Sequence, residues 1–325
     1  MTKDCIYVLL VVMFLLAVGC SDRPEMLPRS GGSPYEVLLV GDADSILYKA
    51  LDVDMAGLPQ PEPLFDVSTI DNSQFKDAAR LSRAIVRLEV DSTIYTQSHV
   101  RFEKNVFARP QIVVYVTSPS KDELSSFMES QGGKMLRNLL VKAELNASVA
   151  ALRQKHNVEA EQMVYEQFGI KMLIPADMLS SKKGKHFLWL SDNANSGMRN
   201  ICVYSVAGHV DDPIAVRDSI MMVNIPGEHE GMFLQTVRES VFKEKAVTKD
   251  SVLSERDVFR GLWEMRGDAM GGPFVLHIIR VDDYTVFVEA FVYAPEMRKR
   301  NKLRQLEAIL FSAKNETITE KKLSN

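Results

Sequence analysis

An unbroken apolar run near the N-terminus, residues 6–16, limits what the rest of the chain can be. It holds eleven residues without a charge, and the small residues Ala17 and Gly19 lead from it to Cys20. This length suits the core of a secretory signal peptide, whereas a membrane-spanning helix needs about 20 apolar residues. We therefore expect residues 1–19 to be a signal peptide and the remainder to fold outside the cytosol. A buried hydrophobic helix is the alternative.

The residues before Cys20 resemble the lipobox of bacterial lipoproteins, in which the cysteine is acylated and becomes the first residue of the mature chain. Lipoboxes usually have leucine three places before the cysteine. Here Ala17 holds that place and Leu16 lies one residue further out. The resemblance implies fatty acids such as palmitate on Cys20, and hence a lipid-anchored protein of the cell envelope. Several acyl chains anchor a protein durably, whereas one binds a membrane only marginally. Ser21 favours the outer membrane, by resemblance to enteric lipoproteins. A signal peptide cleaved without lipidation is the alternative here.

The three cysteines leave no intrachain disulfide in the acylated mature form. Cys5 departs with the signal peptide, Cys20 carries lipid, and Cys202 is then alone in an apolar run. Cys202 is interpreted as a small buried hydrophobic residue, with a nucleophile as the alternative. The fold must therefore rest on its core, which 325 residues at 46% hydrophobic content can supply.

Charge and motif content exclude several partners. The formal net charge is −4 and no basic stripe is present, which argues against nucleic acid as a partner. No metal-binding or phosphate-binding motif is recognised, so no cofactor and no metal are predicted. The expected partners are the membrane, through the N-terminal lipid, and other envelope proteins.

Apolar runs and helical periodicity predict strands and helices in both halves of the chain. In the first half they predict strands at 36–40, 64–67, 84–90, 100–102 and 112–116, and helices from Asp44, over 72–83 and over 121–168, the last bent at Gly132-Gly133. In the second half they predict strands at 171–174, 186–190 and 200–206, a helix at 213–222, a hairpin of 274–279 with 285–292, and a basic C-terminal helix.

The strand–Pro–helix pattern around residues 112–119 returns around 290–295, which suggests an internal duplication. The predicted fold is therefore α+β, with two similar lobes, each an antiparallel-rich sheet with helices packed on one face. The predicted parts are the signal peptide 1–19, a flexible tether 20–34, a first lobe 35–168, a second lobe 169–313 and a frayed tail 314–325.

The candidate binding surface lies in the segment 258–273. This segment contains several glycines, and its apolar and charged residues are interleaved. An aromatic residue beside arginines has the composition of an interface hot spot. The candidate residues are Arg260, Trp263, Glu264, Arg266 and Asp268. The competing interpretation buries Trp263 in the core and pairs the arginines with Glu264 or Asp268.

Three functions remain open from the sequence. The favoured one is a membrane-tethered binding or assembly module, because no recognised catalytic motif is present. The alternative is an envelope hydrolase in which Asp268, Glu264 and His229 or His277 supply acid–base chemistry near Trp263. A purely structural envelope component is the third. The catalytic residues, if any, are unknown.

Three motifs together with the lipobox carry a family resemblance. They are GLPQPEPLFDV at 57–67, RGLWEMRGDAMGGPF at 260–274 and FVYAPEMRKRNKLRQLEAIL at 291–310. The chain resembles, over essentially its whole mature length, an uncharacterised lipoprotein family of Bacteroidetes-type bacteria that is known only as a domain of unknown function. The resemblance implies an envelope lipoprotein and assigns no catalytic residue.

Overall fold

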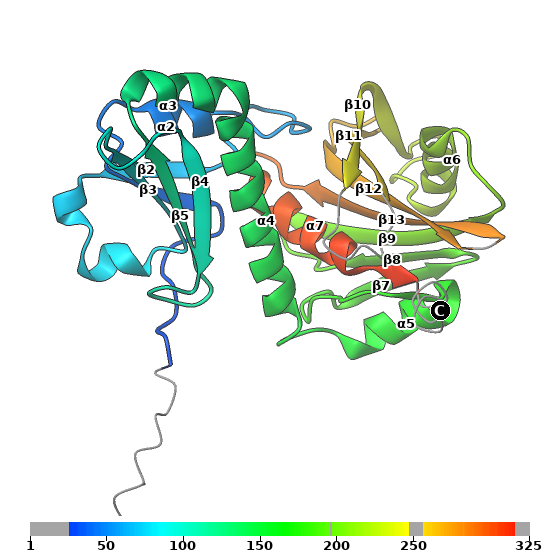
Figure 1. Cartoon of the computed structure of the whole chain (residues 1–325). Coiled ribbons are helices and arrows are strands. Elements are labelled where there is room, and N and C mark those ends of the chain that lie inside the picture. The colour runs from blue at the N-terminus through cyan, green and yellow to red at the C-terminus, as the bar shows by residue number, and fades with distance from the viewer. Residues whose placement is uncertain (1–25, 196, 247–255, 282, 316–325) are drawn as a thin grey trace, which may run out of the picture.

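A computed structural model describes residues 26–195, 197–246, 256–281 and 283–315 of the chain. These residues form two lobes, each built on its own β-sheet, with the long helix α4 (Gly133–Leu152) between them (Figure 1). Within these residues, no helix is both long enough and apolar enough to cross a membrane. The predicted signal peptide and Cys20 lie outside the described residues.

The first sheet is mixed, with strand order β2-β1-β3-β5-β4. Its central strands are apolar and pair in parallel, whereas the edge strand β4 runs antiparallel to β5. Strands buried on both faces need such continuous apolar runs. The bounds are β1 Glu36–Val40, β2 Asp66–Ile70, β3 Ala84–Val90, β4 His99–Lys104 and β5 Ile112–Ser118.

Helices cover one face of this sheet. Apolar residues of α2 (Ile46–Leu51), α3 (Lys121–Phe127) and α4 pack on Leu39, Val86 and Val114. The predicted bend is present: Met128–Gly132 forms a wider helical turn, η3, between α3 and α4. On the opposite face, the predicted helix over 72–83 is wrong. Two short 3₁₀ helices replace it, η1 (Asn72–Gln74) and η2 (Asp77–Leu81).

The second sheet has seven strands in the order β10-β11-β12-β13-β9-β8-β7, and every pairing is antiparallel. The predicted hairpin of 274–279 with 285–292 is confirmed as β12 and β13. The bounds are β7 Ser180–Gly184, β8 Phe187–Ser191, β9 Met198–Ala207, β10 Leu234–Ala246, β11 Arg256–Met265, β12 Gly271–Val281 and β13 Tyr284–Tyr293. A separate two-stranded sheet joins β6 (Ile170–Lys171) to β14 (Lys314–Asn315).

Helices lie on both faces of the second sheet (Figure 1). On one face, α5 (Val158–Phe168) and α7 (Arg300–Ser312) bury their apolar residues against the sheet. On the other face, α6 (Pro213–Asn224) packs through Ile214 and Met221 on an aromatic-rich core. We call these the α7 face and the α6 face.

The predicted class, α+β in two lobes with antiparallel-rich pairing, is confirmed, but the lobes are not alike. One sheet has five mixed strands and the other seven antiparallel strands. The helix α6 also covers a second face where helices were expected on one face alone. The repeated strand–Pro–helix pattern therefore reflects two similar strand ends, since the strand orders of a duplicated unit would agree.

Three predicted boundaries differ from the structure. The helical stripe over 121–168 breaks at 153–157, and α5 belongs to the second core, so the first lobe ends before residue 157 rather than at 168. The tether 20–34 is attached from Pro28 onward, because backbone bonds join residues 28–31 to Leu81 and Arg109. The tail 314–325 begins with the paired strand β14, and residues 316–325 lie outside the description.

The two lobes meet at the first turn of α7. Both carboxylate oxygens of Glu62, from the proline-rich segment of the first lobe, accept backbone N–H groups of α7: Lys299 at 2.7 Å and Arg300 at 2.9 Å. The Arg300 guanidinium donates back to the Pro63 carbonyl at 2.6 Å and to Asp66. Helix N-termini leave such N–H groups unpaired and favour negative charge. The proline-rich segment 58–63 of the first lobe therefore caps a helix of the other lobe.

Replacing Glu62 by alanine is expected to lower the free energy of unfolding of the second lobe by about 2 kcal/mol, because two buried N–H groups lose a charged acceptor. Urea unfolding followed by tryptophan fluorescence measures this, since both tryptophans, Trp189 and Trp263, lie in that lobe. Glu230→Ala, on an exposed turn, is the control and is expected to change stability by less than about 0.5 kcal/mol. Equal stabilities of the two variants would contradict the capping role.

Candidate functional site

Strand β11 places Arg260 and Trp263 on opposite faces of the second sheet, because side chains alternate along a strand. Trp263 is 3% exposed in the α6-face core, where its indole Nε1–H donates to the Val292 carbonyl at 3.3 Å. Arg260 is buried on the α7 face and pairs with Glu244 at 2.8 Å and with Glu307 of α7. These two candidate residues therefore do not share a surface.

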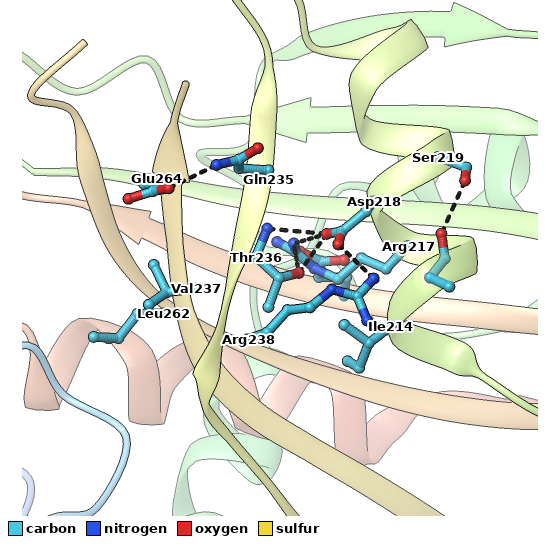
Figure 2. Close-up of polar contacts among 12 residues, drawn as sticks. Ile214, Arg217, Asp218, Ser219, Gln235, Thr236, Val237, Arg238, Leu262 and Glu264 are labelled. Atoms are coloured by element: carbon cyan, nitrogen blue, oxygen red, sulfur yellow. Dashed lines mark hydrogen bonds and ion pairs between the residues drawn. The ribbon is translucent and has the colours of Figure 1, made fainter. Parts of the chain in front are cut away.

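The other three candidate residues are exposed and also divide. Glu264 accepts a hydrogen bond from Gln235 Nε2 at 2.7 Å, at the edge of the sheet (Figure 2). The Arg266 guanidinium lies 5.3 Å from the Phe233 ring centre. Asp268 lies in the turn between β11 and β12. The predicted single surface is thus corrected, and Asp268 and Trp263 alone among the five line one pocket.

That pocket is a cavity of about 340 Å³ on the α6 face, which we call the tryptophan pocket. Two turns, 226–232 and 266–270, border it, and the sheet forms its floor. Four methionines, two tryptophans and other apolar residues make up most of its wall. The lining residues are Trp189, Met198, Asn200, Ile225, Pro226, Gly227, Glu228, Met232, Leu234, Trp263, Met265, Asp268, Met270, Phe291 and Tyr293.

The paired glycines of the MGGPF motif make room for the Trp263 indole. A Cβ added to Gly272 would lie 2.0 Å from the Val292 carbonyl oxygen and 3.1 Å from Trp263 Nε1. Heavy atoms do not approach this closely, so only glycine lets the indole reach the backbone of the neighbouring strands. The motif is therefore explained by the position of Trp263 beside the pocket, and Phe291 packs edge-on to its ring at 5.4 Å.

One polar side chain belongs to the wall of the tryptophan pocket without having been identified from the sequence. Asn200, on β9, is fully buried, and its Oδ1 accepts from Trp189 Nε1 at 2.9 Å. Its Nδ2 has no hydrogen-bond partner among the described residues. The only sequence signal is a polar residue inside an otherwise apolar strand.

A buried ion pair holds α6 on the sheet beside this pocket. Arg217 and Glu289 are both fully buried and joined by bonds of 2.7 and 3.0 Å; Tyr204 donates to the same carboxylate at 2.9 Å. Figure 2 shows Arg217 reaching Thr236, to which its Nη1 donates at 2.7 Å. Burial raises the pKa of Glu289 despite the adjacent guanidinium. The network satisfies polar groups that burial would otherwise penalise, so we assign it to the anchoring of α6.

Two residues considered for chemistry are buried in the core. Cys202 is fully buried, and burial raises the pKa of its thiol well above the usual value, so it stays protonated and unreactive. His277 lies on the α7 face, with its ring edge-on to Phe311 at 5.0 Å. Burial, with Arg256 and Arg260 nearby, lowers the pKa of His277 to about 3. Because Trp263 lies on the α6 face of the sheet and His277 on the α7 face, the two side chains cannot meet.

The remaining acid–base candidates, Asp268, Glu264 and His229, are exposed, and of these Asp268 lines the tryptophan pocket. His229 lies on the turn at 226–232. The preceding residue, Glu228, lines the pocket together with Asp268. Across the described ranges, no group of three or more His, Cys, Asp or Glu side chains is arranged to hold a metal ion.

Comparison with known families divides the chain as the structure does. Residues 30–153 match a domain of unknown function (DUF8532), and residues 157–312 match another domain of unknown function (DUF4837). Each lobe thus resembles a domain of unknown function. No curated protein matches it. The expected resemblance to an uncharacterised family is confirmed at this level, while the lipoprotein character and the bacterial group stay predictions. The second match contains the whole tryptophan pocket.

The buried, neutral His277 gives the protein a predictable pH dependence. The unfolded chain binds a proton on this residue below about pH 6.5, whereas the native state resists protonation down to about pH 3. Native stability is therefore expected to fall as pH drops through this window, by up to about 1.4 kcal/mol per pH unit for this one proton. Below about pH 4.5, Glu307 adds to the loss, because Arg260 and Arg304, acting against burial, lower its pKa to about 2.

His277→Leu is expected to flatten the pH dependence of the free energy of unfolding between pH 6.5 and 4.5, and His229→Leu, on an exposed turn, is the control. Urea unfolding at four pH values between 4.5 and 7.5 measures both. An unchanged slope in His277→Leu would show that the native state binds a proton on His277 as readily as the unfolded chain does.

Proposed function

We propose that this chain is a lipid-anchored binding protein of the bacterial cell envelope, and that the tryptophan pocket is its binding site. The proposal rests on one observation: a preformed cavity whose wall is mostly methionine and aromatic side chains. Small-molecule sites are typically concave and apolar, with a few polar groups. Unbranched, polarisable methionine side chains adapt to ligands of different shape.

The hydrolase alternative has weaker support. Its histidine candidate on β12, His277, is buried on the opposite face of the sheet from Trp263. The carboxylates at the pocket, Glu228 and Asp268, are exposed and lie among apolar neighbours. An exposed carboxylate beside a wall of methionines suits a boundary between ligand and water better than acid–base catalysis.

We further propose that acylated Cys20 anchors this pocket to the membrane of a Bacteroidetes-type bacterium, in the outer membrane. The basis is the resemblance of residues 16–20 to a lipobox and the three family-like motifs. Eight residues separate Cys20 from Arg29, whose backbone already pairs with the first lobe. At about 3.5 Å per extended residue, this spacer holds the domain within roughly 30 Å of the bilayer.

A charge placed in the pocket wall is expected to prevent apolar binding. Met198→Glu should weaken the binding of the neutral fluorescent dye N-phenyl-1-naphthylamine at least tenfold, because a carboxylate must be desolvated when the dye enters. Dye fluorescence titrated against purified Cys20→Ser protein measures this. Met222→Glu, on the exposed side of α6, is the matched control and should bind like its parent. Equal binding by both variants would place the dye elsewhere.

Removal of the acylated thiol is expected to release the protein from the membrane. Wild-type protein should incorporate an alkyne analogue of palmitate in cells and sediment with the envelope, whereas Cys20→Ser should do neither. Cys202→Ser is the control, since that thiol is buried. Soluble wild-type protein without fatty acid and with residues 1–19 intact would contradict the anchoring proposal.

A further inference from the structure

We infer that the ligand of the tryptophan pocket is a neutral compound with a flexible apolar body and a carbonyl oxygen, and that Asn200 Nδ2 donates a hydrogen bond to that oxygen. This inference rests on the proposed function and adds the chemical class of the ligand. It covers ketones, esters and uncharged amides.

The orientation of the Asn200 amide follows from its neighbour. An indole N–H can only donate, so the amide atom 2.9 Å from Trp189 Nε1 must be the oxygen. The other end of the amide is therefore the NH₂ group, which carries two donors.

The unpaired donor points to a ligand because its position is costly without one. Asn200 is fully buried, lies in the pocket wall, and its Nδ2 has no partner among the described residues. Nearly all buried polar side chains in folded proteins are hydrogen-bonded, and exceptions call for an explanation. The pocket wall consists mostly of thioether and aromatic groups, which are poor acceptors, and its two carboxylates, Glu228 and Asp268, are exposed. A ligand oxygen that reaches Nδ2 when the adaptable methionine side chains move aside would supply the missing acceptor.

The charge of the pocket selects a neutral ligand. Two of the fifteen lining residues are charged, and both, Glu228 and Asp268, are acidic. Neither forms an ion pair with another described residue that would cancel its charge toward the pocket. A ligand carboxylate would lose its hydration among the apolar side chains and would meet two like charges at the exposed rim of the pocket. Free fatty acids are therefore disfavoured relative to their neutral derivatives.

The test compares two ligands that differ at one group. In 2-methyl-1-nonene, a CH₂ group replaces the carbonyl oxygen of 2-nonanone while size and shape are kept. Titration of Cys20→Ser protein with each is followed by tryptophan fluorescence and by calorimetry. The fluorescence is specific, because both tryptophans of the chain line this pocket. Wild-type Asn200 is expected to give 2-nonanone about tenfold tighter binding, the usual worth of one buried hydrogen bond. Nonanoate should bind more weakly than 2-nonanone.

Variants at Asn200 assign the preference to this residue. Asn200→Leu removes the donor and should bind the two ligands equally, with the affinity for the alkene kept within about threefold. Asn200→Asp keeps an acceptor for Trp189 but lacks the NH₂ group, so it should also lose the preference for 2-nonanone. This second variant keeps the test valid if Asn200→Leu folds poorly. Asn146→Leu, on the exposed side of α4, is the control and should keep the preference for 2-nonanone.

The outcomes separate this inference from the proposed function. If both ligands bind with equal affinity to wild type, or if the preference survives in Asn200→Leu, the assignment of Asn200 is overturned while an apolar binding site stands. If neither ligand binds and tryptophan fluorescence does not respond, the binding site itself is overturned.

Discussion

The structure depends on one helix, α7, whose first turn and middle are held by charged side chains. Glu62 caps its first turn from the other lobe, and Glu307, fully enclosed, pairs with Arg260 of the sheet and with Arg304 one turn earlier at 2.7 Å. A buried carboxylate persists as a charge only when such partners surround it. Because α7 packs at the same time on β13 and on α4, these contacts fix the second sheet against the first lobe.

The alternation of side chains in the second sheet separates the contacts between the lobes from the tryptophan pocket. Along β11, Arg260 faces α7 and the joint between the lobes, while Trp263 faces α6 and the pocket. The α7 face thus carries the contacts that join the two lobes. The other face combines the anchoring ion pair of Arg217 and Glu289 with an open apolar cavity. A site at the edge of a rigid sheet keeps its shape because its floor cannot move independently.

Local patterns predicted the parts of the fold that depend on neighbouring residues. Apolar runs located most strands, and Gly132-Gly133 located the bend before α4. The prediction of a helix over 72–83 failed because these residues form two 3₁₀ turns that pack Phe75 against the first sheet. Tertiary packing here outweighs the local helical pattern. The site depends on distant pairs: Arg217 and Glu289 are 72 residues apart, and the role of Glu62 requires α7. Asn200 was missed because the strand pattern does not reveal which polar residue lacks a partner.

The proposed role of the tryptophan pocket is to receive a carbonyl compound at Asn200. The most direct measurement is the ¹⁵N–¹H spectrum of the side-chain amides, with the Asn200 signal assigned by its loss in Asn200→Leu. Addition of 2-nonanone is expected to move one of the two Asn200 amide proton signals downfield, as a new hydrogen bond requires, while the signal of exposed Asn146 stays in place. An Asn200 amide that does not respond at saturating ligand would contradict the claim.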